Sequence, residues 1–255
     1  TAASSRRMNT HPPMAKETAT GAPADAAVAA LPTQAAAILD GITALAAKLP
    51  FPVTVACAIR PLSLNSLSQI EHAYLRDLGS GPRRRQWRLG RAALARLFAA
   101  NRPPPGSAGT PQQAQWSLCH TDDLAIAVAT TERDLAIGVD IEAPPGPSER
   151  SRRLFLSDRE QRWLGMLSAS TRQSATNRLW ALKEAAYKSV SVPQTVVLRD
   201  FRLRTAALEH GVADCATAPG ASCVYLTDDV AGTAVALAYC RLQADAAPGS
   251  IAKKA

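Results

Sequence analysis

The sequence lacks the features that mark secreted proteins, membrane proteins and zinc ribbons. Its five cysteines are odd in number and none of them stand in Cys-x-x-Cys spacing, which favours neither a disulfide framework nor a cysteine-based zinc site. Residues 1–32 hold no apolar run long enough for a signal peptide or a membrane span. We therefore expect a cytoplasmic protein with free or buried thiols and no membrane partner.

Acidic residues are fewer than basic ones, which leaves a net charge of +8. Such an excess favours an acidic partner, which could be nucleic acid, a phosphorylated small molecule or an acidic protein. Charge alone does not choose among these three. The 255 residues, 47% hydrophobic and 20% charged, suffice for one large core or two small ones.

The two ends of the chain differ in composition from the middle. Residues 1–32 are rich in Ala, Pro, Thr and Ser, and we expect them to form a disordered tail, as we do for residues 244–255. Thr33 is a candidate N-cap for an amphipathic helix that ends near Pro50. Its apolar positions recur at helical spacing and are Ile38, Ile42, Leu45 and Leu49.

Elsewhere, local patterns predict alternating strands and helices. Strands are expected over residues 53–59, 124–129, 196–203, 222–226 and 233–242. Helices are expected up to about residue 78 and over residues 83–100 and 176–190, and a Ser157-x-x-Glu160 capping box predicts another helix start. A polar turn is expected at His120.

The acidic residues with the clearest chemical purpose lie in residues 135–142. This segment alternates as a strand does, with Ile137, Val139 and Ile141 on one face and Gly138, Asp140 and Glu142 on the other. Alternate side chains on one strand face are roughly 6.5 to 7 Å apart. Asp140 and Glu142 could therefore bind one cation between them, and Gly138 would leave room for it beside them.

A third carboxylate follows on a predicted helix. Leu179, Leu182, Ala186 and Val190 form an apolar stripe, while Trp180, Glu184 and Lys188 align at i, i+4 and i+8. Three carboxylates and a lysine indicate Mg²⁺ holding a phosphate substrate. Two plainer readings stay open: the strand could end at a solvated turn, and Glu184 with Lys188 could form an ordinary surface ion pair.

Together the two segments resemble the Sfp-type 4′-phosphopantetheinyl transferase family. The strand is similar to its Gly-(Ile/Val)-Asp-(Ile/Val)-Glu motif, and residues 180–188 are similar to its Trp-x-x-Lys-Glu-(Ser/Ala)-x-x-Lys helix. Upstream, residues 116–121 are similar to its Phe-Ser-x-Ser-His-Ser turn, and residues 83–93 to its basic helix. Cys119 departs from the family's usual serine.

The resemblance implies an α+β fold of two similar half-domains related by a pseudo-twofold axis, with the active site between them. We expect an N-terminal half over residues 33–137, on the coenzyme A phosphate side, and a C-terminal half over residues 138–243, on the metal and carrier-protein side. Because both halves belong to one chain, a monomer is expected.

The implied activity is transfer of the 4′-phosphopantetheine arm of coenzyme A to a serine of an apo acyl or peptidyl carrier protein, with release of 3′,5′-ADP. Asp140, Glu142 and Glu184 are the expected Mg²⁺ ligands, and Glu184 and Lys188 the catalytic residues. Residues expected to bind coenzyme A are Arg76, Arg83, Arg84, Cys119, His120, Lys183 and Lys188.

Arginines are expected to serve two further surfaces. Arg84, Arg88 and Arg91 share one face of the basic helix, which could also be an ordinary solvated surface. Acidic carrier-protein docking would suit Arg159, Arg162, Arg172 and Arg178.

Two rival functions remain open from the sequence. A Mg-dependent nuclease or phosphodiesterase would also combine paired carboxylates with a basic surface, although the family reading implies no nucleic-acid partner. A non-catalytic nucleotide-binding or carrier-protein-binding module would keep the fold and lose the metal ligands. Fatty acid, polyketide, peptide and lysine-precursor synthesis are equally compatible pathways.

Overall fold

The structure is a computed structural model that describes residues 24–101, 115–190, 195–218 and 220–242. The tail expected over residues 244–255 lies outside these ranges. Residues 1–23 of the expected N-terminal tail also lie outside them. No helix among the described residues is both long and apolar enough to cross a membrane.

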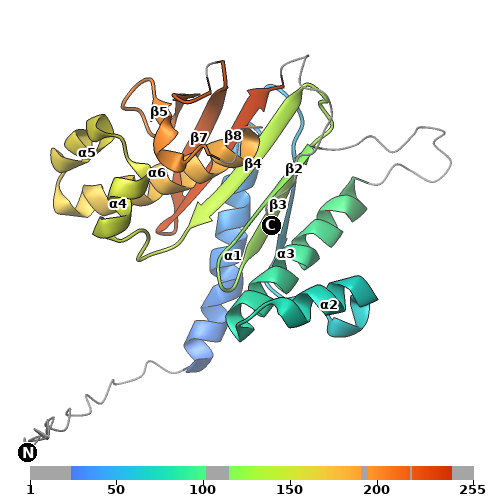
Figure 1. Ribbon diagram of the computed structural model, residues 1–255. Coiled ribbons are helices and arrows are strands. Elements are labelled where there is room, and N and C mark those ends of the chain that lie inside the picture. The colour runs from blue at the N-terminus through green and yellow to red at the C-terminus, as the bar shows by residue number, and fades with distance from the viewer. Residues whose placement is uncertain (1–23, 102–114, 191–194, 219, 243–255) are drawn as a thin grey trace, which may run out of the picture.

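Helices cover two antiparallel sheets (Figure 1). The α-helices are α1 (Ala24–Ala46), α2 (Gln69–Asp77), α3 (Gly81–Ala100), α4 (Glu149–Phe155), α5 (Asp158–Gly165) and α6 (Ala169–Ser189), and the 3₁₀ turns are η1 (Leu64–Ser66) and η2 (Leu198–Asp200). The strands are β1 (Thr54–Ala58), β2 (Gln115–His120), β3 (Ala125–Thr130), β4 (Leu135–Glu142), β5 (Phe201–Leu203), β6 (His210–Cys215), β7 (Ser222–Val230) and β8 (Thr233–Arg241).

The two halves repeat one topology, as expected for an α+β fold of paired half-domains. The first sheet has the order β1-β3-β2 and the second the order β4-β8-β7-β6-β5. In each half a first strand is followed by helices and then by an antiparallel pair, whose last strand returns to lie beside the first. The β1–α3–β2–β3 segment thus has the same order of pairing as β4–α6–β7–β8.

Helix α1 joins the halves on one side of the sheets. Its buried residues pack with β3 and with β4 and β8 in a single core. That core contains the predicted apolar stripe of Ile38, Ile42, Leu45 and Leu49 together with Ile137, Val139 and Ile141 of β4, which confirms both apolar faces. The helix begins at Ala24, so Thr33 lies within it and is not its N-cap.

On the opposite sides of the sheets, small residues let the long helices approach closely. Beneath α3 the strand positions are Ala56, Ala58, Ala125, Ala127 and Ala129. Beneath α6 they include Ala136, Ala234, Ala236 and Ala238. Because alanine side chains fill little space, the backbones of helix and strand lie close together, and polar side chains at the edge of each helix can reach the sheet.

Three local predictions need correction. Residues 115–120 form β2, since each pairs with β3 from Gln115 with Thr130 to His120 with Ala125; His120 therefore ends a strand, and the turn follows it. Helix α6 starts at Ala169, not near residue 176, because the Ser168 hydroxyl caps it by accepting from Thr171 N at 3.3 Å. Of the strand expected over residues 196–203, only residues 201–203 form a strand.

Candidate functional site

Strand β4 and helix α6 bring the predicted carboxylates within electrostatic reach of one another. Gly138 of β4 faces the α6 backbone, where a Cβ would overlap the carbonyl oxygen of Ala185. The glycine therefore serves the contact between strand and helix and leaves no free space for a cation, contrary to our expectation. Its effect is indirect, since the close approach places Glu184 and Lys188 beside the strand face that carries Asp140.

Lys188 is bonded directly to the acidic strand. Its Nζ donates to Asp140 Oδ1 at 2.7 Å and to the Val139 carbonyl at 3.2 Å. Burial acts to lower the pKa of Lys188, but the adjacent Asp140 carboxylate outweighs burial and raises it. The ammonium thus stays charged inside the site.

The remaining two acids lack a hydrogen-bonded cation among the described residues. Burial, together with the charges of Asp140 and Glu184, raises the pKa of Glu142 to about 7. Burial and the charge of Asp140 likewise raise the pKa of Glu184, against the opposing effect of Lys188. Three carboxylates that act on one another through space, with one lysine between them, form a site whose negative charge is incompletely balanced.

This donor set fits a hard divalent cation in its chemistry. Carboxylate oxygens are the ligands that Mg²⁺ prefers, and a cation would relieve the repulsion that raises the pKa of Glu142. The described side chains do not stand in a ready-made cluster, because no group of three or more His, Cys, Asp or Glu residues among them is close enough to hold a metal ion. Asp140 is bonded to Lys188 instead.

The N-terminal half contributes basic groups to the same region. Strands β2 and β4 lie side by side (Figure 1), and the Val139 N–H donates to Ser117 Oγ across this junction at 3.1 Å. At the end of β2, partial desolvation of the His120 ring and the nearby positive charges of Lys188 and Arg83 lower the pKa of His120. His120 and Arg83 therefore lie within electrostatic reach of each other and of Lys188.

Two expected coenzyme-binding side chains are buried. Cys119 is buried in the α1 core, and burial raises the pKa of its thiol, so no sulfur is presented to a phosphate. Lys183 is fully buried behind α5 and donates to the Phe155 carbonyl and to Glu160 Oε2, each at 2.7 Å. A lysine enclosed in this way supports α5, and its ammonium does not point to solvent.

The arginine face of α3 turns out to bind the protein's own chain. Arg84 donates to the carbonyls of Leu78 and Arg76. Arg88 donates to the Leu62 carbonyl at 2.7 Å, and Arg91 pairs with Glu71. These guanidiniums hold the η1–α2 segment against α3. Arg83 is the arginine of this helix whose charge acts on His120. Arg76 is exposed on α2.

Sequence reasoning missed two residues that shape the site. Ser117 joins the sheets through its hydroxyl, a role that the pattern of residues 116–121 does not predict. Glu160 was identified as a capping residue, and it does cap α5 by accepting from Ser157 N at 2.7 Å. Its second role, as the partner of Lys183, depends on a contact between residues 23 positions apart and has no local signal.

Comparison with known proteins agrees with this geometry. Residues 136–240 match the family model described as the 4′-phosphopantetheinyl transferase superfamily. The matched segment runs from β4 to β8 and so includes all three carboxylates. No curated protein matches the chain. The match shows that residues 136–240, the segment that carries the carboxylates, form a domain of the 4′-phosphopantetheinyl transferase superfamily.

Proposed function

We propose that this protein transfers the 4′-phosphopantetheine arm of coenzyme A to a serine hydroxyl of an apo acyl or peptidyl carrier protein, releasing 3′,5′-ADP. The observation that carries the proposal is the meeting of opposite charges at the β2–β4 junction: three carboxylates and Lys188 from the C-terminal half, and His120 with Arg83 from the N-terminal half. Such a pairing suits a pyrophosphate that is held together with a cation.

Each charged group has a part in this reaction. Arg83 and His120 bind the 3′-phosphate of coenzyme A, since a guanidinium and an imidazole N–H both donate to phosphate oxygens. Lys188 offsets negative charge on the pyrophosphate. Mg²⁺, when bound by Asp140, Glu142 and Glu184, supplies Lewis-acid stabilisation of the phosphate oxygens.

Glu184 is the group that takes the proton from the attacking serine, either directly or through one water. It lies on α6 beside the acidic strand, where the charge of Asp140 acts on it. The serine oxygen then forms a bond to the β-phosphorus, and the bond from that phosphorus to the 3′,5′-ADP oxygen breaks.

The repeated topology supports assignment to the Sfp type, in which one chain supplies both halves of the site. For the same reason we propose that the protein acts as a monomer in the cytoplasm, with no nucleic-acid or membrane partner. Of the four arginines expected to meet a carrier protein, Arg172 and Arg178 are bonded within the C-terminal half. Arg159 and Arg162 remain exposed on α5 for such a contact.

Mass spectrometry of an apo carrier protein tests the proposal. The protein is incubated with coenzyme A, Mg²⁺ and fatty acid, polyketide or peptide carrier proteins, and a phosphopantetheinyl adduct is expected on at least one of them. Glu142→Gln and Glu184→Gln should abolish the adduct, whereas Glu149→Gln, an exposed acid on α4, should retain it. Full activity in either site variant would refute the site, and no adduct on any carrier would refute the reaction.

A further inference from the structure

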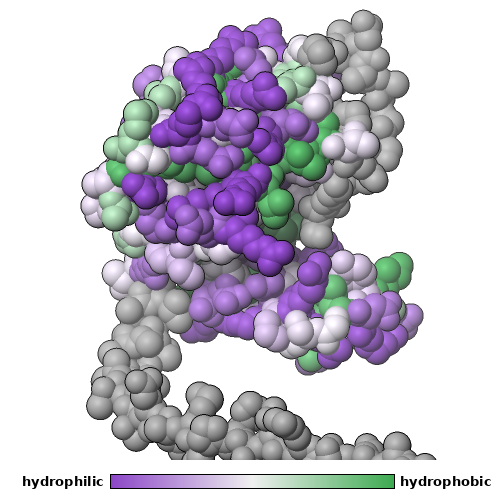
Figure 2. All heavy atoms as spheres, turned by 60° about the vertical axis from the view of Figure 1, so that its left-hand side comes forward, coloured by the Kyte–Doolittle hydropathy of each residue, from purple (hydrophilic) through white to green (hydrophobic). Residues whose placement is uncertain are grey.

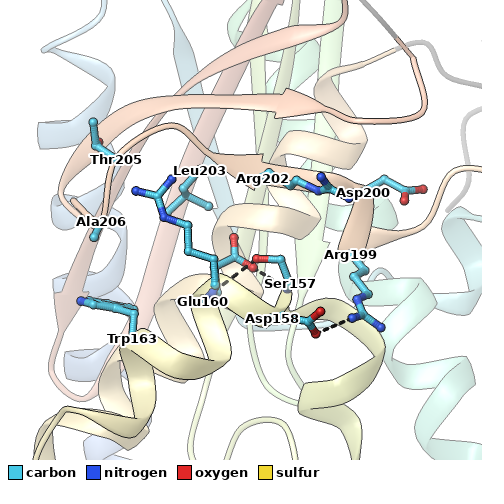
Figure 3. A pocket seen from close by; sticks show the side chains of 11 residues that line it. Ser157, Asp158, Glu160, Trp163, Arg199, Asp200, Arg202, Leu203, Thr205 and Ala206 are labelled. Carbon is cyan, nitrogen blue, oxygen red and sulfur yellow. Dashed lines mark hydrogen bonds and ion pairs between the residues drawn. The ribbon is translucent and has the colours of Figure 1, made fainter.

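A hollow lies in the C-terminal half, and its lining includes none of Asp140, Glu142 and Glu184. Its volume is about 540 Å³, within the range of sites for small organic ligands. Helix α5 forms one wall, and η2, β5 and the turn after β5 form the other (Figure 3). Figure 3 places Trp163 at one end, below Ala206, and Arg199 with Asp158 at the other.

Two arginines on facing walls of this hollow have no hydrogen-bond or ion-pair partner among the described residues. Arg159 belongs to α5 and Arg202 to β5. Within the described part of the chain, neither side chain donates a hydrogen bond or forms an ion pair. By contrast, Arg199 at the same hollow is paired with Asp158 at 2.7 Å.

The acid at the floor does not cancel these two charges. Glu160 lines the hollow, but its Oε2 already accepts from the buried Lys183 and from Ser157 N. Burial lowers the pKa of Lys183, and the positive charges of Arg199 and Arg202 lower it further. The Glu160 carboxylate acts in the opposite direction but does not cancel these effects. The third acid that lines the hollow, Asp200, accepts from the Val197 N–H. Among the described residues, no lining carboxylate is therefore paired with Arg159 or Arg202, and both guanidiniums can bind an anionic group of a ligand.

The floor and the end wall add two more features. Glu160 Oε1 is buried without a hydrogen-bond partner among the described residues, and as an acceptor it favours a donor group of a ligand at the floor and keeps the anionic group toward the arginines. Trp163 is partly buried against the core beneath and offers a rigid aromatic surface at the end of the hollow (Figure 3). The surrounding surface on this side is mostly hydrophilic (Figure 2), which does not favour an apolar partner.

The geometry points to a binding site for a small organic anion with a flat ring, in which Arg159 and Arg202 hold a carboxylate or phosphate group and Trp163 contacts the ring. Guanidinium groups bind both anions through paired N–H donors. The ring gains contact area on Trp163 that a bare anion lacks. Arg159 is shared with the proposed carrier-protein contact, but occupancy of this site by a small anion does not require the transfer of phosphopantetheine.

Isothermal titration calorimetry of the full chain tests the site, with benzoate and phenyl phosphate as probes and acetate and inorganic phosphate as anions without a ring. At least one ring-bearing probe should bind, about tenfold or more tightly than its ringless counterpart. Arg202→Ala and Trp163→Leu should each weaken that binding about tenfold or more, as expected for loss of a charge-assisted hydrogen bond or an aromatic contact. Arg162→Ala removes an exposed arginine of α5 that does not line the hollow and should leave binding unchanged.

Because anions could also bind at the β2–β4 junction, His120→Ala is the second control. Binding that survives in His120→Ala and is lost in Arg202→Ala supports the site. Binding lost in His120→Ala but kept in Arg202→Ala overturns it, as does the absence of binding by both ring-bearing probes. Neither result bears on the carrier-protein assay, which is scored without these probes.

Discussion

Replacing Lys183 should reveal how strongly a buried ion pair holds α5 against α6, the helix that carries Glu184. The Lys183 side chain is fully enclosed, and the Glu160 side chain is 8% exposed. Lys183→Met keeps the length of the side chain but leaves the Glu160 carboxylate buried without a counter-charge. Removing one member of a buried pair costs about 3 to 5 kcal/mol of unfolding free energy, and we expect a loss in that range.

Details of the site favour a large effect. Lys183 Nζ also donates to the Phe155 carbonyl, so the variant loses a hydrogen bond at the end of α4 as well. Glu160 keeps one strong contact, the N–H of Ser157, through its capping box. Its Oε1 has no partner even before the change. The carboxylate therefore has little alternative hydrogen bonding with which to recover the lost stability.

Urea unfolding of a double-mutant cycle measures the pair. Lys183→Met, Glu160→Gln and the double variant are compared with wild type, and Arg162→Met serves as an exposed control that should change the free energy of unfolding by less than about 0.5 kcal/mol. The double variant should be destabilised by less than the sum of the singles, by about 1 kcal/mol or more. Strict additivity, or a loss below about 1 kcal/mol in Lys183→Met, would contradict the reasoning.

The same variant separates two roles for Lys183. If the lysine acts only by supporting α5, the folded Lys183→Met protein, assayed well below its melting temperature, keeps the wild-type KM for coenzyme A. A KM raised about tenfold in fully folded protein would restore the coenzyme-binding role that the sequence suggested. The buried hydrogen bonds of Lys183 favour the first result.

Two further predictions concern packing and pH. Gly138→Ala should lower the free energy of unfolding in urea by about 3 kcal/mol or more, since the added methyl group overlaps the Ala185 carbonyl. The control Gly165→Ala, which has open space around it, should change that free energy by less than about 1 kcal/mol. Equal effects of the two variants would rule out the packing argument. Burial raises the pKa of Cys240 to about 11 and that of Cys223 to about 12, so the unfolded chain loses these protons first and stability falls as pH rises from about 8.5. The free energy of unfolding should be lower at pH 10 than at pH 7.5, and Cys240→Ala should reduce this difference. An equal difference in wild type and Cys240→Ala would show that the Cys240 thiol does not cause it.

Patterns within single segments were good guides wherever the physics is local. The two-residue alternation of residues 135–142 predicted a strand with Asp140 and Glu142 on one face, and β4 has that form. The helical spacing of Glu184 and Lys188 predicted their common face, and both act on Asp140. These inferences hold because backbone geometry fixes the direction of neighbouring side chains within one element.

Patterns were poor guides to the partners of long side chains. Arg84, Arg88 and Arg91 share a helix face as predicted, but their guanidiniums bind the chain between residues 62 and 78. Lys183, one position before Glu184, points into the core to a partner on α5. A flexible charged side chain reaches whatever acceptor the fold brings near, and that acceptor belongs to another element.

The sequence by itself determined the strand, the helix and the kinds of charged groups that this protein places on them, because periodicity and residue chemistry are properties of each segment. Only the tertiary structure decided that β2 lies against β4, that His120 and Arg83 therefore share a region with Lys188, and that Gly138 lets α6 approach the sheet. The physical reason is that packing joins residues far apart in the chain through shape and hydrogen bonding, which no single segment encodes.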